Sequence, residues 1–323
     1  MKKRVLITGA TGFIGSHLTE LCVEKGFKVT AFDRYSSNYS LGNLESSNYK
    51  KDIKFVFGDI RDYDSVEKVV KNNDIVFHLA ALIGIPYSYV SPLAYIKTNV
   101  EGTYNVLEAV KKHSNEQVIV TSTSEVYGSA VKVPIREDHR LLGQSPYAAS
   151  KIGADNLAIS YFSSFNLPVK IIRPFNAFGP RQSPRALIPT IITQAMRGNK
   201  ILLGNLKTTR DYTYVKDTCR AYLELAKSNK LFGKPANVGV SKEIKTKDIA
   251  SSIIQQINQK AKIKVTRIRT RPSKSEVMRL VCDSQLFKNH TNWKPKYSFD
   301  SGLKETIDWF KNHAGSSPNI YHI

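Results

Sequence analysis

Short apolar runs alternate with amphipathic stretches along the first half of the chain. The runs have the length of β-strands, and the stretches between them carry apolar residues at helical spacing. Near-continuous apolar strands that alternate with helices are typical of a parallel sheet covered by helices on both faces. Six such strands are predicted, at residues 3–8, 27–33, 53–59 and 74–81, from residue 118 onward, and at 168–174.

The alternation is less regular beyond residue 174. The pattern predicts a strand near residues 201–204, after a helix at Leu187–Arg197, and two later helices at Ile249–Gln259 and Asp300–Asn312. In the first half, one long helix is predicted over residues 92–112. These elements indicate a second, smaller lobe of mixed helices and strands.

We therefore expect an α/β protein with a Rossmann-type doubly wound parallel sheet and a smaller mixed α/β C-terminal lobe. The sheet domain is predicted at residues 1–175, with 210–240 returning to it. The lobe is predicted at residues 176–209 and 241–323.

The composition narrows the class of protein. The chain has 323 residues, of which 41% are hydrophobic and 23% charged, as in globular proteins that bury a large core. No apolar run approaches the roughly 18 residues that a membrane span needs. The apolar run near the N-terminus is broken by glycines too early for a signal peptide. We expect a cytoplasmic protein without a membrane partner.

Charge and cysteine content exclude further classes. The net charge is +21, from 48 basic and 27 acidic residues, but the longest basic run is Lys2–Arg4. Such a diffuse positive surface attracts small anions, whereas nucleic-acid binding needs a focused basic face. Cys22, Cys219 and Cys282 are far apart, and neither they nor the seven histidines show a metal-ligand spacing. We expect no nucleic-acid partner, disulfide framework or metal site.

A glycine-rich turn follows the first strand. Gly9, Gly12 and Gly15 have a G-x-x-G-x-x-G spacing between a strand and an amphipathic helix. This arrangement binds a pyrophosphate at the helix N-terminus. Asp33 ends the next strand, 18 residues past Gly15, where a carboxylate accepts hydrogen bonds from a ribose 2′-hydroxyl. It favours NAD over NADP, although Arg34 could pair with a 2′-phosphate.

Small and acidic residues end the next strands of the predicted sheet. Asp59 and Ile60 close the third strand, where an adenine would lie. Ala80 and Ala81 end the fourth, where small side chains let a cofactor lie flat. His78, within that apolar strand, is expected to be a core histidine.

Potentially catalytic groups gather in two short runs. The strand that begins at residue 118 ends in Thr123, Ser124 and Glu125. In the second run, Ser145 is a predicted helix N-cap, and Tyr147 and Lys151 stand one turn apart on one helix face. A hydroxyl, a carboxylate, a phenol and an ammonium in one cleft are suited to moving protons and a hydride.

Five motifs in this order resemble the extended short-chain dehydrogenases of the NAD-dependent epimerase/dehydratase family, which act on nucleotide sugars. The resemblance spans nearly the whole chain and implies a Rossmann domain that binds NAD and a lobe that binds a nucleoside-diphosphate sugar. It also implies a homodimer through a four-helix bundle, here residues 92–112 and 147–165. The motifs are GATGFIG (9–15), HLAA (78–81), NVEGT (99–103), Tyr147-x-x-x-Lys151 and RPFNAFGP (173–180).

The resemblance also indicates a reaction. Thr123, Ser124 and Glu125 before Tyr-x-x-x-Lys look like the sugar 4,6-dehydratases, whereas simple 4-epimerases usually have small residues at Glu125. UDP-glucuronate decarboxylases share the trio, and they and the epimerases remain alternatives. A non-catalytic NAD-binding sensor is a more remote alternative. The segment from Arg271 to the last predicted helix most resembles dehydratases of legionaminic acid biosynthesis, which act on a GDP- or UDP-linked N-acetylglucosamine.

The family mechanism assigns a role to each catalytic residue. Tyr147, its pKa lowered by Lys151, would take the C4 hydroxyl proton, and Thr123 would hold the C4 oxygen. Lys151 would also hold the nicotinamide ribose. Glu125 is the predicted base at C5, and either Glu125 or a water on Ser124 would assist departure of the C6 hydroxyl.

Further binding residues come from the same resemblance. Asn176, Arg210 and Arg279 are expected at the diphosphate, and Ser88 at the substrate. The full set expected at the cofactor is Gly9, Thr11, Gly12, Phe13, Ile14, Gly15, Asp33, Arg34, Asp59, Ile60, Leu79, Ala80, Ala81, Asn99, Thr121, Tyr147 and Lys151.

Overall fold

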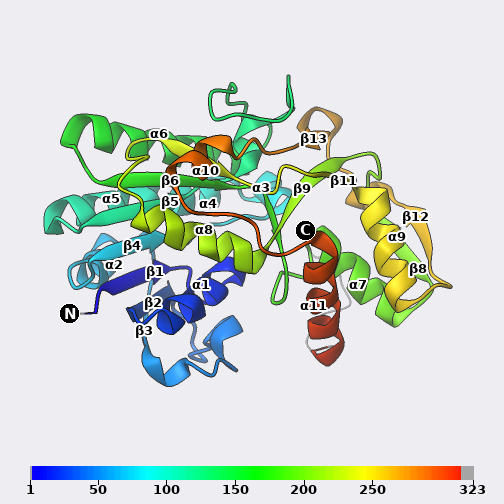
Figure 1. The fold of residues 1–323 in the computed structure, drawn as a ribbon, viewed down its shortest axis with the longest axis horizontal. Helices are drawn as coiled ribbons and strands as arrows, with labels where there is room; N and C mark the ends of the chain where they lie inside the picture. The colour runs from blue at the N-terminus through cyan, green and yellow to red at the C-terminus, as the bar shows by residue number, and fades with distance from the viewer. Residues whose placement is uncertain (1, 314–323) are drawn as a thin grey trace.

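A seven-stranded parallel sheet forms the larger part of the molecule. The structure is a computed structural model that describes residues 2–313. The strand order is β10-β6-β5-β4-β1-β2-β3, which confirms the predicted doubly wound sheet (Figure 1). The strands are β1 (Arg4–Thr8), β2 (Lys28–Arg34), β3 (Ile53–Gly58), β4 (Ile75–His78), β5 (Gln117–Thr121), β6 (Val169–Pro174) and β10 (Pro235–Val238).

Helices cover both faces of this sheet, because the central strands are apolar on both sides. On one face, α2 (Tyr63–Val70) packs against α5 (Gly102–His113), which packs against α6 (Pro146–Phe165). On the other face, α1 (Phe13–Glu24) packs against α8 (Val215–Lys227). The two layers bury separate apolar clusters, and the three cysteines are buried and free.

The point where the strand order reverses lies between β1 and β4. Parallel pairing sets Thr8 opposite His78, so the carboxyl ends of both strands meet at one edge. Ligands of doubly wound sheets bind in the crevice outside such a switch point. The glycine-rich turn begins directly after Thr8 and therefore lies at this crevice.

The smaller lobe is built around strand β9 (Thr209–Tyr214), which pairs with three short strands. A two-stranded parallel sheet and two further helices lie beside it, at the right of Figure 1. No helix in residues 2–313 has the length and apolar character needed to span a bilayer. The remaining elements are β7 (Asn176–Phe178), β8 (Lys200–Leu203), β11 (Glu243–Lys245), β12 (Lys262–Val265), β13 (Arg279–Leu280), α3 (Ile85–Val90), α4 (Pro92–Tyr95), α7 (Leu187–Arg197), α9 (Thr246–Ile257), α10 (Gln285–His290) and α11 (Phe299–Asn312).

The segment 210–240, predicted to return to the sheet domain, is divided in the structure. Helix α8 packs on α1, and β10 pairs with β6 in the main sheet. Residues 210–214, however, lie in β9 of the lobe. The domain boundaries remain a prediction, and residues 314–323 of the predicted lobe lie outside the described part of the chain.

The single helix predicted over residues 92–112 is wrong in one respect. After α4, residues Ile96–Glu101 form a π-helical segment, and α5 then continues to His113. The buried side chain of Asn99 lies in this segment, and its amide is used by the loop after β4. Its Oδ1 accepts a hydrogen bond from the Leu82 backbone N–H at 2.9 Å, and Nδ2 donates to the Leu82 carbonyl at 3.0 Å. Such segments are frequent at functional sites.

His78 is a fully buried core histidine, as expected. Thr103 donates its hydroxyl proton to the Asn99 carbonyl, so it accepts from His78 Nε2 at 3.1 Å. Thr8 then donates to His78 Nδ1 at 2.8 Å. This assignment requires a neutral ring, and burial lowers its pKa to about 3.

His17 on α1 is a partly buried histidine, and it contacts the lobe. Its Nε2 bonds the Pro180 carbonyl at 3.0 Å, and burial lowers its pKa to about 4. A folded-state pKa below the unfolded value of about 6.5 gives stability that is present above pH 6.5 and is lost as pH falls toward 4.

We predict that the variant His17→Gln removes this pH dependence. The glutamine amide can still donate to Pro180 but does not titrate. Between pH 7 and pH 5, the free energy of unfolding should fall in the wild type relative to the variant by roughly 2 kcal/mol. Urea unfolding of both proteins at the two pH values measures this difference, and parallel pH profiles would contradict the assignment.

Candidate functional site

The glycine-rich turn is closely packed against the switch point. Gly9 has a φ of +69°, and a Cβ there would lie 2.9 Å from the backbone of Ala80. A Cβ on Gly15 would lie 2.0 Å from the Gly9 carbonyl oxygen. The turn therefore brings β1, α1 and the end of β4 together, with no side chain between them. The first N–H groups of α1, at Phe13 and Ile14, remain available to an anion.

Asp33 lies beside this turn and fixes its conformation. Asp33 Oδ2 accepts from the Thr11 N–H at 2.8 Å and from its hydroxyl at 2.7 Å. Asn43 donates its backbone and side-chain N–H groups to the Thr11 carbonyl. A carboxylate has about four acceptor positions, so Asp33 can still accept from a ribose hydroxyl. The turn and Asp33 thus fit a dinucleotide, while the neighbouring Arg34 is exposed.

Two expected cofactor residues use their side chains elsewhere. Both carboxylate oxygens of Asp59 are bonded by Arg61, at 2.9 and 2.5 Å. Asn99 is fully buried, and its bonds go to Leu82 and Ser150. Both side chains thus already have partners within the protein, and a cofactor contact at either position stays a prediction. Asn99 holds the loop after β4 against α6.

Other residues expected at the cofactor lie at or just after the carboxyl ends of β3, β4 and β5. Ile60 is buried against Gly102 at the start of α5. Leu79, Ala80 and Ala81 follow β4 and are half-buried, and the Ala80 N–H donates to the Thr8 hydroxyl at 3.1 Å. Thr121, the last residue of β5, bonds the Tyr222 hydroxyl at 2.9 Å.

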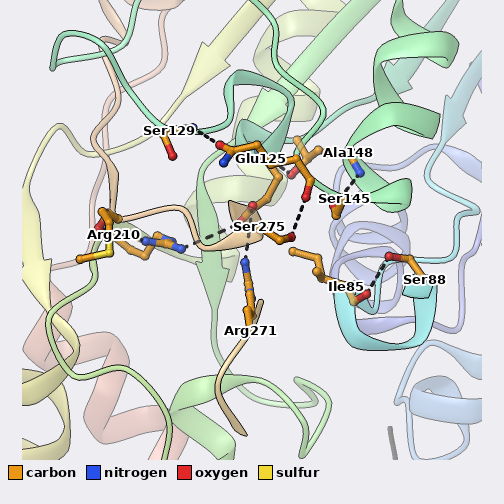
Figure 2. Close-up of polar contacts among 12 residues, drawn as sticks. Ile85, Ser88, Glu125, Ser129, Ser145, Ala148, Arg210, Arg271 and Ser275 are labelled. Carbon is orange, nitrogen blue, oxygen red and sulfur yellow. Dashed lines mark hydrogen bonds and ion pairs between the residues drawn. The ribbon is translucent and has the colours of Figure 1, made fainter. Parts of the chain in front are cut away.

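The two runs of potentially catalytic residues meet in the structure. Thr123 caps a short 3₁₀ turn, and its Oγ1 accepts from the Glu125 N–H at 3.3 Å. Ser145 caps α6 by accepting from Ala148 at 3.1 Å (Figure 2), which sets Tyr147 in the first helical turn. Tyr147 is close enough to the Thr123 hydroxyl and to the Glu125 carboxylate for both to change its pKa. Ser124 is buried beside them.

Burial controls the protonation of the Tyr147–Lys151 pair. Burial raises the pKa of Tyr147 well above its usual value; the bond with Thr123 opposes this, and the Glu125 charge adds to it. Burial also lowers the pKa of Lys151 to about 8. The expectation that Lys151 lowers the pKa of Tyr147 is therefore wrong for the ligand-free protein. Tyr147 is therefore a neutral phenol.

An acidic residue on the same helix face was missed by the sequence reasoning. Asp155 is fully buried one turn beyond Lys151, and its charge opposes the fall in the Lys151 pKa. It accepts from Ser122 at 2.7 Å and pairs with Arg173 at 2.9 Å. The four-residue spacing from Tyr147 through Lys151 to Asp155 was the available signal.

The lobe contributes two arginines to the site. Arg210 on β9 has Nη2 4.0 Å from Glu125 Oε1, and Arg271 has Nη1 3.7 Å from Glu125 Oε2 (Figure 2). Arg279, which was expected at the diphosphate, is half exposed and bonds both oxygens of Glu243 at 2.8 Å. Arg271, and not Arg279, therefore lies beside Glu125, while the expected diphosphate contact of Arg279 stays a prediction. Nothing in the sequence distinguished it from the other basic residues around it.

Two further expected substrate residues differ in outcome. Ser88 is fully buried, and its hydroxyl donates to the Ile85 carbonyl at 2.7 Å within α3 (Figure 2). Its hydroxyl proton is thus already used within α3, and the expected substrate contact stays a prediction. Asn176 on β7 lies opposite Tyr212 of β9. Its Oδ1 is buried and has no hydrogen-bond partner among the described residues.

The fold and site together define an extended short-chain dehydrogenase: a glycine turn at the switch point, with a Tyr–Lys pair and a carboxylate beside it. A sequence model of the GDP-mannose 4,6-dehydratase family matches residues 6–306. The chain belongs to this family.

Similar proteins catalyse several reactions. The chain is 36% identical to a UDP-N-acetyl-α-D-glucosaminuronate decarboxylase of Bacillus cytotoxicus, covering 96% of this chain and 98% of that protein. The structure of DesIV, a dTDP-glucose 4,6-dehydratase from Streptomyces venezuelae with NAD bound, matches with a TM-score of 0.89 and 27% identity over 97% and 98% of the two chains. The structure of a UDP-N-acetylglucosamine 4-epimerase from Methanobrevibacter ruminantium matches with a TM-score of 0.88 and 31% identity. The match covers 97% of this chain and 100% of that chain.

We predict that Gly15→Ala abolishes dinucleotide binding. The new methyl group would meet the Gly9 carbonyl at 2.0 Å, so the turn or α1 must shift, at a cost of roughly 1–3 kcal/mol. Dinucleotide released from purified, denatured protein and quantified by chromatography should fall at least tenfold.

Gly198→Ala is the matched control, because a Cβ there meets nothing within 4 Å. This variant should keep the wild-type dinucleotide content. Equal content in wild type and Gly15→Ala would place the cofactor elsewhere.

Proposed function

We propose that the protein is an NAD-dependent nucleotide-sugar 4,6-dehydratase. Its substrate would be a GDP- or UDP-linked N-acetylglucosamine, as in legionaminic acid biosynthesis, and its product the 4-keto-6-deoxy sugar. The observation that carries this proposal is the convergence of Thr123, Glu125 and Tyr147. This set provides one proton acceptor for a C4 hydroxyl and a separate carboxylate for the neighbouring C5 proton.

NAD would be held by the glycine turn, Asp33 and Lys151. When bound, it supplies a positively charged hydride acceptor at C4 and the hydride donor that later reduces C6. The Asp33 carboxylate favours NAD over NADP, because it would repel a 2′-phosphate. The cofactor is regenerated in each turnover, so the reaction needs no external oxidant.

Tyr147 and Thr123 act at the C4 oxygen. Tyr147 takes the hydroxyl proton as C4 is oxidised, and Thr123 keeps the oxygen and the phenol in line through its bond to Tyr147. Burial has raised the pKa of this phenol, so deprotonation depends on positive charge from Lys151 and the ligand. Asp155 favours the charged form of Lys151.

Glu125 acts after C4 has become a ketone. The ketone acidifies the C5 proton, which the Glu125 carboxylate removes, and the C6 hydroxyl then leaves as water. Glu125 can return this proton to the leaving hydroxyl, or a water held by Ser124 can supply it. Asn176, Arg210 and Arg271 hold the diphosphate from the lobe side.

Decarboxylation of a UDP-uronate is the second candidate, because the two arginines beside Glu125 could also bind a sugar carboxylate. The 36% identical relative has such an activity. 4-Epimerisation is a third and uses only Tyr147, Lys151 and Thr123. The three reactions are distinguished by what the substrate loses.

A homodimer is also proposed, through a bundle of α4 to α6 from two subunits. Apolar side chains on the α4–α5 segment are exposed at intervals of three, then eight, residues: Leu93 is 63% exposed, Ile96 46% and Tyr104 45%. Phe165 at the end of α6 is 54% exposed. A second copy of the same surface would cover them.

We predict that purified protein converts a GDP- or UDP-linked N-acetylglucosamine to a 4-keto product lighter by one water. No net NADH should accumulate, because the hydride returns to the sugar. Mass analysis after incubation with GDP-, UDP- and TDP-sugars measures this outcome. Release of carbon dioxide from a UDP-uronate would establish the decarboxylase instead, and a product of unchanged mass the epimerase.

The role of Glu125 is tested within the same assay. Glu125→Gln should keep the bound dinucleotide but lose product formation by roughly 10²–10⁴-fold. Glu137→Gln is a suitable control, because Glu137 is a largely buried carboxylate that accepts from the Asn237 N–H, away from the site. Full activity of Glu125→Gln would remove Glu125 as the base.

For the dimer, we predict a solution mass of twice the 36.3 kDa chain by light scattering. The double variant Leu93→Glu, Ile96→Glu should be monomeric, because it puts charges into an apolar interface. Ile268→Glu, at a 74% exposed position in the lobe, should remain dimeric. A wild-type monomer, or a dimer that survives the double change, would contradict this interface.

A further inference from the structure

Glu125 lies between two guanidinium groups that come from the lobe. Arg210 and Arg271, named the anion clamp here, are lobe residues, whereas Glu125 follows β5 of the main sheet (Figure 2). The Glu125 and Arg210 side chains are only 13% and 8% exposed. The clamp and the carboxylate therefore interact in a largely dehydrated site, where attraction between charges is strong.

The Glu125 carboxylate does not hydrogen-bond the guanidinium groups of the anion clamp. Its oxygens are 4.0 and 3.7 Å from the nearest guanidinium nitrogens, beyond hydrogen-bond distance. Arg210 uses Nη1 on the Thr209 carbonyl at 2.9 Å, which leaves Nη2 directed at Glu125. Nη1 of Arg271 is buried and has no hydrogen-bond partner in residues 2–313. Guanidinium donors are thus held ready for a better acceptor.

The charge balance points the same way. Two guanidinium groups face one carboxylate, which leaves an excess of one positive charge. The neighbouring Tyr212 phenol senses both arginines. A diphosphate carries more charge than a carboxylate and offers several oxygens to the planar forks of the arginines.

The segment that carries Arg271 is fastened in place. Ser275 donates to the Gln144 carbonyl at 2.6 Å and bonds the Tyr89 hydroxyl at 2.6 Å. Gln144 in turn donates to the Lys274 carbonyl at 2.7 Å. Gln144 directly precedes Ser145, the cap of the helix that bears Tyr147. The clamp is thus positioned relative to the catalytic helix before any ligand binds.

We propose that Glu125 is a stand-in anion for the substrate: it occupies the clamp in the empty site, and the substrate diphosphate displaces it. This inference rests on the proposed nucleotide-sugar substrate. When the diphosphate binds, its oxygens pair with the two guanidinium groups in place of Glu125. The carboxylate is then released toward C5 of the sugar. The base is therefore freed only when the site is loaded.

Competition of this kind has a direct signature in binding. Isothermal titration of the NAD-loaded protein with GDP and with UDP measures it without turnover. Glu125→Gln removes the competing charge and should tighten binding of the preferred diphosphate about tenfold, whereas Arg271→Gln should weaken it about tenfold. In the Arg271→Gln background, adding Glu125→Gln should gain no more than about threefold, because the two residues act on each other.

The controls separate the clamp from general charge effects. The neutral nucleosides guanosine and uridine should bind wild type and Glu125→Gln equally. Arg279→Gln, which removes an equally basic side chain paired with Glu243, should leave diphosphate affinity unchanged. Unfolding midpoints of all variants, measured with the same NAD content, show whether each remains folded.

Two outcomes overturn the proposal: unchanged or weaker diphosphate binding by Glu125→Gln, or an equal gain with and without Arg271. The binding cycle is independent of the reaction assay. If the protein proves to be a decarboxylase or an epimerase, the substrate still carries a diphosphate, and the predicted competition stands.

Discussion

The arrangement of the catalytic groups depends on one buried ion pair, between Asp155 of α6 and Arg173 of β6. Both side chains are almost completely excluded from solvent, and Nη2 of Arg173 lies 2.9 Å from the carboxylate. Asp155 also accepts from Ser122, and Arg173 donates to the Tyr127 hydroxyl at 2.9 Å. The pair therefore fastens the helix that bears Tyr147 to the segment that bears Glu125. Loss of either partner would leave an uncompensated buried charge, at a cost of about 3–5 kcal/mol.

Sequence reasoning performed well where chemistry is local. The strand, glycine turn and helix at residues 4–24 follow from short-range rules, because glycine spacing and apolar periodicity act within a few residues of each other. The meeting of Glu125 with Tyr147 could be anticipated, because parallel strands bring their carboxyl ends to one edge. The family match confirms the class of fold that these patterns indicated.

Sequence reasoning could not anticipate how tertiary contacts use individual side chains. Arg271 and Arg279 are both basic residues of one segment, and only the fold brings one to Glu125 and the other to Glu243. Ser88 and Asn99 have polar side chains in site-forming segments, yet both are used by nearby backbone groups. The π-helical segment around Asn99 packs against α6, a contact that helical periodicity does not report.

The pKa of Tyr147 also depends on the fold in a way that the sequence does not report. A four-residue spacing predicts that Lys151 stands near the phenol, but it carries no information about water. Burial disfavours the charged form of both groups, so it raises the pKa of Tyr147 and lowers that of Lys151. The empty site thus contains a neutral phenol, a weakened ammonium and a carboxylate held by two arginines. Spacing along a helix thus reports which groups are neighbours, whereas burial, which only the fold determines, decides how they are protonated.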